Sequence, residues 1–186
     1  ESLYQAVRVS FDSLAVAFQE FAEGGNRPLR IGMLPFFASE VIIPHLGQIT
    51  ERLGGLRIEI DSTIEPTALT HVDPARRLDA VIRFGDQPAN GCKNIELAPL
   101  RLVPVVSPAL RATTDLETVD ALFAAPRVDS GGIGGWVSYA GAIGAALPKT
   151  GADHVAVDNY VSAMRAVEQG LGAGIAVLPL TSRWIM

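Results

Sequence analysis

The stretch from Asp153 to Leu180 constrains the fold most, because it predicts two strands separated by one helix. Residues 154–157 (HVAV) predict a short strand, and residues 175–178 (IAVL) form the continuous apolar run that is typical of a strand buried on both faces. Between these strands, apolar residues recur at helical spacing, at Val161, Met164, Val167 and Leu171. The glycines of GLGAG at 170–174 end the helix, because glycine readily adopts a left-handed turn. This order predicts a βαβ unit in a parallel sheet.

The start of this helix is also a candidate for ligand binding. Asp158 or Asn159 caps the helix, since either side chain can accept a hydrogen bond from an orphan backbone N–H. Ligands of open α/β sheets bind beyond the carboxyl ends of the strands, and Asn159 follows such an end. Two interpretations stay open here. The segment is either a packed crossover with no further role, or its helix end faces a ligand at the edge of the sheet.

Residues 2–23 contain neither proline nor glycine and carry a heptad pattern. Its a and d positions are all apolar, at Tyr4, Val7, Phe11, Leu14, Phe18 and Phe21. Two helices need such a seam in order to pack on each other. Gly24 and Gly25 then separate the helix from the rest of the chain. We therefore predict a linker and dimerisation helix over residues 1–25, and packing of this helix on its own domain is the alternative.

The remaining chain alternates strands and helices twice, which predicts an α/β protein with two lobes. The first lobe, residues 28–106, has predicted strands at 29–34, 56–60 and 78–85. A helix with Ser39 as its N-cap follows the first strand, and Pro44 either lies in its first turn or kinks it. The second lobe spans residues 107–178 and contains the βαβ unit. Residues 179–186 are expected to begin a return to the first lobe.

Composition limits the functional classes. With 48% hydrophobic and 19% charged residues among 186, the chain has the composition of a globular protein. Its net charge of −5 argues against direct nucleic-acid binding by these residues, since phosphate contacts require clustered Lys and Arg. The single cysteine, Cys92, excludes an intrachain disulfide and fits a reducing compartment. No apolar run is long enough to cross a membrane. We therefore expect a cytoplasmic protein without a membrane partner.

The sequence carries no recognisable arrangement of catalytic residues. Ser130 lies in DSGGIGG, which lacks the G-x-S-x-G spacing of a nucleophile elbow. The three histidines are scattered and have no metal-ligand spacing. The GLGAG segment follows a helix and precedes a strand, which reverses the order of a dinucleotide-binding turn. We expect neither catalysis nor a bound metal or cofactor.

Several short motifs, taken together and in order, resemble the effector-binding part of LysR-type transcriptional regulators. They are LRIGML at the first strand, ARRLDAVIRFGD, LRLVPVVSPAL, Trp136 and VEQGLGAGIAVLP. Each motif is a short apolar run, so the specificity lies in the ordered set, which covers residues 1–180. RFGD at 83–86 is similar to the subgroup that includes regulators of glycine cleavage and β-lactamase induction. Two features depart from the family pattern: Gly54 and Gly55 stand where a proline is usual, and the family continues beyond Met186.

The resemblance implies a fold and a set of partners. The fold is a two-lobed α/β effector domain like type 2 periplasmic binding proteins, with a small-molecule effector in the cleft between the lobes. The helix at 2–23 would be the linker that pairs two subunits in a homodimer or tetramer. DNA would be bound by a winged helix-turn-helix domain upstream of this chain.

By the same resemblance, four loops at the carboxyl ends of strands line the effector cleft, together with second-lobe residues. The candidate residues are Pro35, Phe36, Phe37, Ser39, Arg83, Phe84, Ser107, Ser130, Gly131, Asn159 and Gly174. Free backbone N–H groups near Ser39 suit a carboxylate or phosphate, and Arg83 suits an anion. The alternatives are structural. Ser39 is then only a helix cap, Arg83 is solvated or pairs with Asp79 or Asp86, and the aromatic residues, including Trp136, belong to the core.

We therefore expect the ligand-sensing domain of a LysR-type transcriptional regulator. Effector binding would shift the two lobes, and the paired linker helices would transmit this shift to DNA-binding domains. The rival hypothesis is an exported solute-binding protein, which shares the two lobes but is monomeric and carries a signal peptide. A third hypothesis is a dimerising module with a vestigial cleft. Residues upstream of Glu1 would separate the first two, and binding tests with small organic acids would separate the third.

Overall fold

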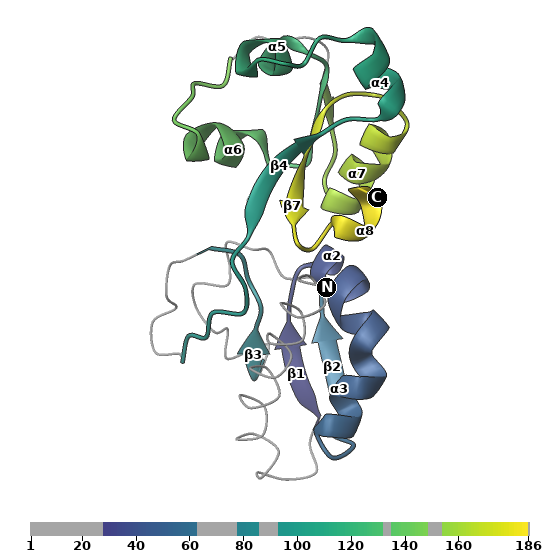
Figure 1. Ribbon diagram of the computed structural model, residues 1–186. Coiled ribbons are helices and arrows are strands. Elements are labelled where there is room, and N and C mark those ends of the chain that lie inside the picture. Colours follow the sequence, from purple (N-terminus) through teal and green to yellow (C-terminus); the bar gives the residue numbers. More distant parts are fainter. Residues whose placement is uncertain (1–27, 63–77, 86–92, 132–134, 149–153, 186) are drawn as a thin grey trace. The chain divides into compact units, whose positions relative to one another are not determined.

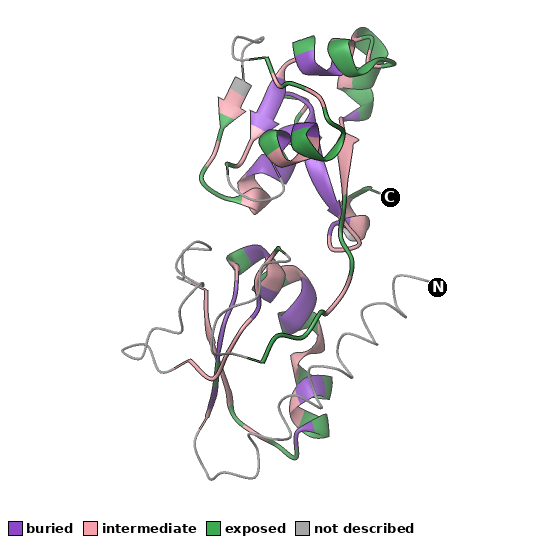
Figure 2. Ribbon diagram, turned by 90° about the vertical axis from the view of Figure 1, so that its left-hand side faces the viewer, coloured by how far each residue is buried: buried purple, intermediate pink, exposed green. Residues whose placement is uncertain are grey.

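The computed structural model describes residues 28–62, 78–85, 93–131, 135–148 and 154–185. The chain divides into two compact units, unit 1 (Glu1–Pro99) and unit 2 (Leu100–Met186) (Figure 1). In each unit the buried residues concentrate in the strands and on one side of the helices (Figure 2). The helix predicted at 2–23 and its six seam residues lie outside the described residues.

Unit 1 is built around a parallel sheet. Its elements are β1 (Leu29–Gly32), α2 (Pro35–Phe37), η1 (Ala38–Ile42), η2 (Ile43–His45), α3 (Leu46–Arg52), β2 (Ile58–Asp61) and β3 (Ala80–Val81). The strand order is β2-β1-β3, and both pairings are parallel. The third strand is two residues long, much shorter than the predicted run at 78–85. Ile42, Ile49 and Leu53 are buried with β1 in the core of this unit, and Leu46 packs against them.

The helical segment after β1 begins earlier than predicted. Leu34 is the N-cap, and Pro35 lies in the first turn, where its missing N–H costs no helical hydrogen bond. Ser39 therefore lies inside the segment, and its hydroxyl donates to the carbonyl oxygen of Phe36 at 3.2 Å. The prediction that Ser39 caps this helix was wrong, because Pro35 already starts it. Pro44 lies in the 3₁₀ turn η2, between the π-helical turn η1 and α3, where the helix type changes.

Unit 2 contains most of the described secondary structure. Its elements are β4 (Arg101–Val105), α4 (Pro108–Thr113), α5 (Val119–Ala124), β5 (Arg127–Asp129), α6 (Trp136–Ala142), β6 (His154–Ala156), α7 (Tyr160–Glu168), β7 (Gly174–Leu178) and α8 (Ser182–Ile185). β5 and β6 are parallel, and β4 and β7 are antiparallel. A parallel bridge between Arg127 and Ala173 joins β5 to the start of β7. The predicted βαβ unit is therefore present as a crossover from β6 through α7 to β7, with β5 between the two strands.

The last strand of this crossover, β7, is buried over Gly174–Val177, as its continuous apolar run predicts. Its partner β4 contains a proline, Pro104, opposite Ile175. The carbonyl of Ile175 and the N–H of Val177 do not face β4. They form hydrogen bonds with the hydroxyl of Tyr160 in α7, on the other side of β7. Pro104 therefore occupies a position where the ladder needs no N–H donor, which explains why β4 accepts a proline.

Two helices of unit 2, α4 and α6, had no counterpart in the sequence prediction. They contain 6 and 7 residues, too few for helical periodicity to be visible. α6 carries Trp136, which is 2% exposed and packs edge to face against Phe123 and Tyr139. Trp136 is thus a core residue, as the structural alternative proposed.

Candidate functional site

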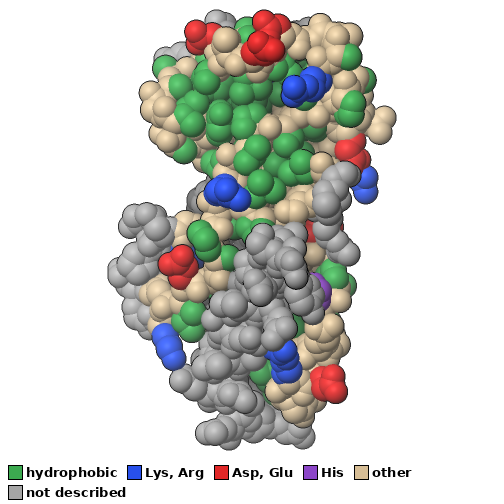
Figure 3. All heavy atoms as spheres, in the orientation of Figure 1, with side chains coloured by type: hydrophobic (Ala, Val, Ile, Leu, Met, Phe, Trp, Pro, Cys, Tyr) green, Lys and Arg blue, Asp and Glu red, His purple; other side chains and the backbone are tan. Residues whose placement is uncertain are grey.

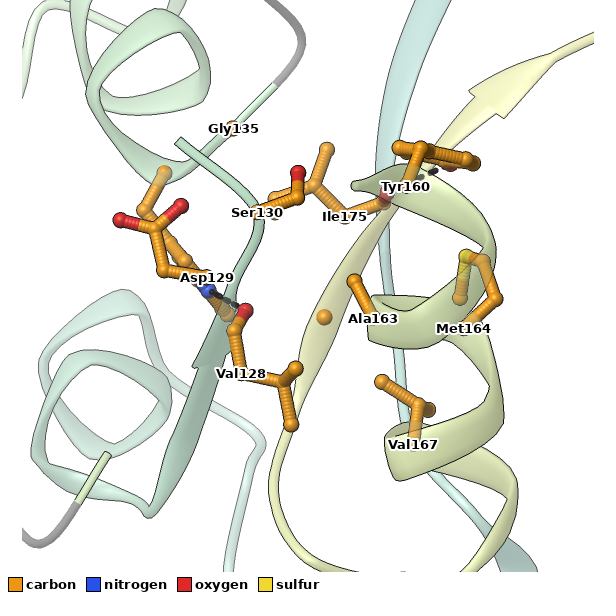
Figure 4. Close-up of a pocket in the computed structure, with 11 residues that line it drawn as sticks. Val128, Asp129, Ser130, Gly135, Tyr160, Ala163, Met164, Val167 and Ile175 are labelled. Atoms are coloured by element: carbon orange, nitrogen blue, oxygen red, sulfur yellow. Dashed lines mark hydrogen bonds between the residues drawn. The ribbon is translucent and has the colours of Figure 1, made fainter. Parts of the chain in front are cut away.

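A small hollow lies in unit 2, between the carboxyl end of β5 and the buried face of α7 (Figure 4). It is lined by Val128, Asp129, Ser130, Gly135, Trp136, Tyr160, Ala163, Met164, Val167, Gly174 and Ile175. The space that it offers to a water-sized group is about 10 Å³, roughly what one water molecule requires. The hollow by itself therefore accommodates only a small group of a larger ligand.

The alternation of side chains along β5 explains which residues face the hollow. Val128 points toward α7, where it packs with Ala163 and Val167, whereas the carboxylate of Asp129 points away from that helix (Figure 4). The Asp129 carboxylate instead accepts a hydrogen bond from the N–H of Gly131 at 3.1 Å. Gly131 has φ of +65°, a conformation that glycine adopts without strain. This bond holds the turn that carries Ser130 at the mouth of the hollow.

Asn159 fixes the start of α7 on the other side of the hollow. Its side-chain oxygen accepts from the N–H of Ser162 at 2.8 Å, and its amide nitrogen donates to Asp158 at 2.8 Å. Of the two caps that the sequence allowed, the structure thus uses Asn159. This cap orients the first turn of α7 so that Tyr160 and Ala163 line the hollow.

Tyr160 is the important residue of this site that the sequence prediction did not identify. Its hydroxyl donates to the carbonyl of Ile175 at 2.7 Å and accepts from the N–H of Val177 at 2.9 Å. The phenol therefore supplies the two hydrogen bonds that a neighbouring strand would otherwise give β7. Burial raises the pKa of Tyr160 to about 12, so the hydroxyl keeps its proton at neutral pH.

The sequence signal for Tyr160 was weak because the predicted apolar stripe was right at Met164 and Val167 but wrong at its two ends. The predicted stripe began at Val161, which is only half-buried, and ended at Leu171, which is 52% exposed. The buried face of α7 consists of Ala163, Met164, Ala166 and Val167. Alanines carry little weight in a hydrophobic pattern, so the true face was not apparent.

Gly174 lines the hollow because α7 approaches β7 very closely there. A Cβ atom at this position would lie 2.5 Å from Cγ2 of Val167, which is well inside van der Waals contact. Any larger residue would push α7 away from the strand. Gly174 is therefore required by the packing, in addition to its predicted place in the site.

The site residues predicted in unit 1 lie at the carboxyl edge of its sheet. The segment from Pro35 to Ser39 follows β1, and Arg83 and Phe84 follow β3. Because β1 and β3 are adjacent and parallel, these two segments meet at the same edge. Phe36 is 5% exposed and therefore belongs to the interior of unit 1, and Phe37 packs against its core. Ser39 is exposed, and Arg83 and Phe84 are half-buried.

Ser107 is separated from the other predicted residues of unit 2. Its hydroxyl oxygen accepts from the N–H of Leu110 at 3.2 Å and caps α4. It is buried beside Gly170, which follows the end of α7, whereas Asn159 marks the start of that helix. The 9 residues of α7 span about 13 Å. β4 runs antiparallel to β7, so its carboxyl end lies at the opposite edge from that of β5. The structure gives Ser107 a capping role and brings only Ser130, Gly131, Asn159 and Gly174 together.

The surface side chains, the possible metal ligands and the helix lengths further limit the kinds of site that the described residues can form. On the face shown in Figure 3, hydrophobic side chains gather over unit 2, and Lys and Arg side chains stand singly. Within the described residues, no group of three or more His, Cys, Asp or Glu side chains is placed to hold a metal ion. In the described part of the chain, no helix is long and apolar enough to span a membrane.

Two α/β units, each with polar loops at the carboxyl edge of its parallel strands, define the class of two-unit α/β binding domains. Residues 22–185 match the family model of the LysR substrate-binding domain. The match covers most of the chain, which therefore belongs to the LysR substrate-binding domain family. The resemblance inferred from the sequence motifs is confirmed.

Relatives and solved structures agree with this assignment. The chain is 26% identical over 178 residues to the HTH-type transcriptional activator AmpR of Citrobacter freundii, covering 95% of this chain and 59% of AmpR. The effector-binding domain of that AmpR superposes with a TM-score of 0.61 at 21% identity, over 84% of this chain and 76% of the domain. The effector domain of AmpR from Pseudomonas aeruginosa gives a TM-score of 0.64 at 21% identity, over 84% and 73%. CrgA, a LysR-type transcriptional regulator from Neisseria meningitidis, gives 0.67 at 16% identity, over 95% and 60%.

These matches confirm the fold predicted for residues beyond the N-terminal helix, that of a LysR effector-binding domain with the type 2 periplasmic-binding-protein architecture. They favour a regulator domain over the exported solute-binding protein. The chain spans 59% of the length of the AmpR relative.

Proposed function

We propose that this chain senses a small-molecule effector on behalf of a LysR-type regulator of transcription. The observation that carries the proposal is the convergence of the Ser130–Gly131 turn, the start of α7 and Tyr160 on one hollow at the carboxyl end of β5. Ligands of α/β sheets bind at such edges. Family membership supports the sensing role, and a regulatory, non-enzymatic function in the cytoplasm follows from the same proposal.

The chemistry of the hollow suggests which part of an effector it takes. The start of α7 favours negative charge, because the aligned peptide dipoles leave partial positive charge there. The Ser130 hydroxyl can donate or accept a hydrogen bond. The floor of the hollow is apolar and holds one small group. We therefore propose an effector with a carboxylate near Asn159 and a methyl-sized apolar group beside Met164.

The rest of the effector site comes, in this proposal, from the carboxyl edge of unit 1. The residues are Pro35, Phe36, Phe37, Ser39, Arg83 and Phe84, with Ser130, Gly131, Asn159 and Gly174 in unit 2. Arg83 is the only cation in this set and would pair with an anionic group of the effector. Phe36 would contribute through its backbone and by supporting the loop, since its ring is buried.

The signal would leave through the helix at residues 1–25, with Tyr4, Val7, Phe11, Leu14, Phe18 and Phe21 forming the seam of a homodimer or of a tetramer built from it. DNA would be bound by a winged helix-turn-helix domain outside these residues, in keeping with the similarity of the chain to AmpR, an HTH-type transcriptional activator. Transmission requires that the regulator switch between two conformations and that the effector bind these conformations with different affinities.

Calorimetric titration of the chain with small carboxylic acids and short peptides tests the effector site. For any ligand that binds, Ser130→Ala should weaken binding about 5- to 50-fold, as loss of one hydrogen bond at a partly buried site does. Thr113→Ala is the matched control, since it removes a hydroxyl from exposed α4. If the S130A and T113A proteins bind the ligand with equal affinity, the hollow is not part of the effector site.

Sedimentation equilibrium tests the dimer role of the N-terminal helix. Phe11→Glu places a charge at a central seam position and should shift the chain toward monomer, because charged residues are disfavoured at a buried a position. Gln5→Glu adds the same charge off the seam and should leave the dimer intact. A monomeric wild-type chain at high micromolar concentration would contradict the proposal.

A further inference from the structure

A positively charged side chain lies buried in unit 2, and the described residues give it no partner of opposite charge. Arg127, the first residue of β5, is 7% exposed. Its Nη1 atom is fully buried, and it has no hydrogen-bond partner in the described part of the chain. The ion pairs found among the described residues all involve other arginines, Arg30, Arg57 and Arg165. Burying an unpaired charge is strongly unfavourable, so this arrangement needs an explanation.

The position of the guanidinium follows from β5. Val128 points toward α7, so its neighbour Arg127 points to the opposite face of the strand, where α6 packs. The guanidinium carbon lies 5.9 Å from the centre of the Trp136 ring, within the range of a cation–π contact. The Trp136 ring is itself held in place, because its N–H donates to the carbonyl of Val128 at 2.9 Å.

The contact with Trp136 compensates only part of the cost. An aromatic face attracts the positive charge, but it offers no acceptor in the plane of the guanidinium for its five N–H groups. The nearest acidic residue along β5, Asp129, accepts from Gly131 and is not among the ion pairs found between described residues. The Nη1 donor of Arg127 is thus left for an acceptor that the described residues do not supply.

We propose that Arg127 is the centre of a binding site for a small oxyanion, a carboxylate or phosphate, on the α6 face of unit 2. The planar fork of a guanidinium matches two oxygens of such a group with two parallel hydrogen bonds. A cation or a neutral ligand would leave the buried charge uncompensated. The Trp136 ring forms one wall of the site.

This site is distinct from the proposed effector hollow. Arg127 does not line that hollow, and it lies at the start of β5, whereas Ser130 follows the end of the strand. The two sites share one residue, Trp136, which lines the hollow and covers the guanidinium. The inference therefore stands independently of the effector proposal, and Trp136 is its natural reporter.

Fluorescence of Trp136 provides the test. The chain has two tryptophans, and Trp184→Phe leaves Trp136 as the sole emitter. This variant is titrated separately with inorganic phosphate and with acetate, with sodium chloride holding the ionic strength constant. We expect a saturable change in emission with at least one of the two anions. Saturation by phosphate alone or by acetate alone identifies the preferred group, and saturation by both shows a general oxyanion site.

Three further substitutions in the same background assign the effect to the guanidinium fork. Arg127→Met should abolish the saturable change, and Arg127→Lys, which keeps the charge but loses the fork, should weaken it at least tenfold. Arg165→Met is the matched control, because Arg165 is an exposed arginine near the other tryptophan, and it should leave the titration unchanged. A change that never saturates, or one that persists in the R127M protein, would overturn the proposal.

Thermal unfolding gives an independent reading. In sodium chloride without oxyanions, the R127M protein should melt at the same temperature as the parent or higher, because an unpaired buried charge has been removed. Saturating phosphate or acetate should raise the melting temperature of the parent and not that of R127M. If R127M melts lower than the parent without oxyanions, the chain itself supplies the partner of Arg127, and the proposal fails.

Discussion

Replacing Tyr160 by Phe tests how unit 2 holds its central strand. The substitution removes one oxygen atom and leaves the ring in place. It deprives the carbonyl of Ile175 and the N–H of Val177 of their shared partner. Both residues are 5% exposed, so water does not readily replace the phenol. We expect the substitution to destabilise β7 as a whole, because these two backbone groups face away from β4 and have no strand partner there among the described residues.

The expected magnitude follows from the two unpaired groups. A buried backbone group that loses its partner costs about 1–3 kcal/mol, and the cavity left by one oxygen atom is small. The Tyr160→Phe change should therefore lower the free energy of unfolding by roughly 2–4 kcal/mol. Against a typical total of about 5–15 kcal/mol, this is a large fraction of the stability of a small domain.

Urea unfolding followed by tryptophan fluorescence measures this loss in unit 2, since both tryptophans, Trp136 and Trp184, lie in that unit. Hydrogen exchange at the Val177 amide gives a local reading and should accelerate about 30- to 1000-fold, the factor that corresponds to the same free energy. Tyr139→Phe is the control, because Tyr139 packs through its ring against Phe123, and it should change stability by less than about 0.5 kcal/mol. If the Y160F protein matches the Y139F protein in both measurements, the phenol does not secure β7.

Three other outcomes are expected in the same unit. Gly174→Ala should destabilise it by about 1–3 kcal/mol, because the new Cβ would meet Val167 at 2.5 Å, and adding Val167→Ala should recover part of this loss in urea unfolding. Trp136→Phe should cost about 1–3 kcal/mol, since the N–H that donates to Val128 is lost; an unchanged urea midpoint would contradict this. Burial raises the pKa of Tyr160 to about 12, above its value of about 10 in the unfolded chain. Stability is therefore fully present below about pH 10 and decreases by roughly 2–3 kcal/mol as the pH rises through about 12. The Y160F protein should lack this decrease.

The crossover of unit 2 was predictable because its signals are long and agree with each other. β7 is a continuous apolar run between a glycine turn and Pro179, and α7 has 9 residues with a capping asparagine. The carboxyl-edge grouping of Ser130, Gly131 and Asn159 follows from the parallel strands alone. Ser107 departs from this grouping because β4 runs antiparallel to β7, a direction that the extended run at 97–106 does not reveal.

Other features were hidden for identifiable reasons. A start of the first helix at Pro35 competes with a start at Ser39, and both residues are favourable at helix starts. Leu171 was counted with the apolar face of α7, but the helix ends at Glu168 and Gly170 turns the chain with φ of +76°. Tyr160 and Arg127 acquire their roles from contacts with residues far along the chain or on another element. No local pattern encodes those contacts.

The hollow and the stability of β7 depend on the same residues, which has a consequence for sensing. The helix α7 is fastened to β7 near its start by the phenol of Tyr160 and in its last turn by the close approach of Val167 to Gly174. Both residues line the hollow, as does Ile175 of the strand. A ligand group that enters the hollow contacts Tyr160 and Val167 at once. It binds only when α7 is packed on β7, so it stabilises this packing by mass action. Occupancy should therefore slow exchange of the β7 amides more than exchange of amides in α4, which lies at the far end of α7. This difference would separate a specific occupant from a general stabilising effect of the solution.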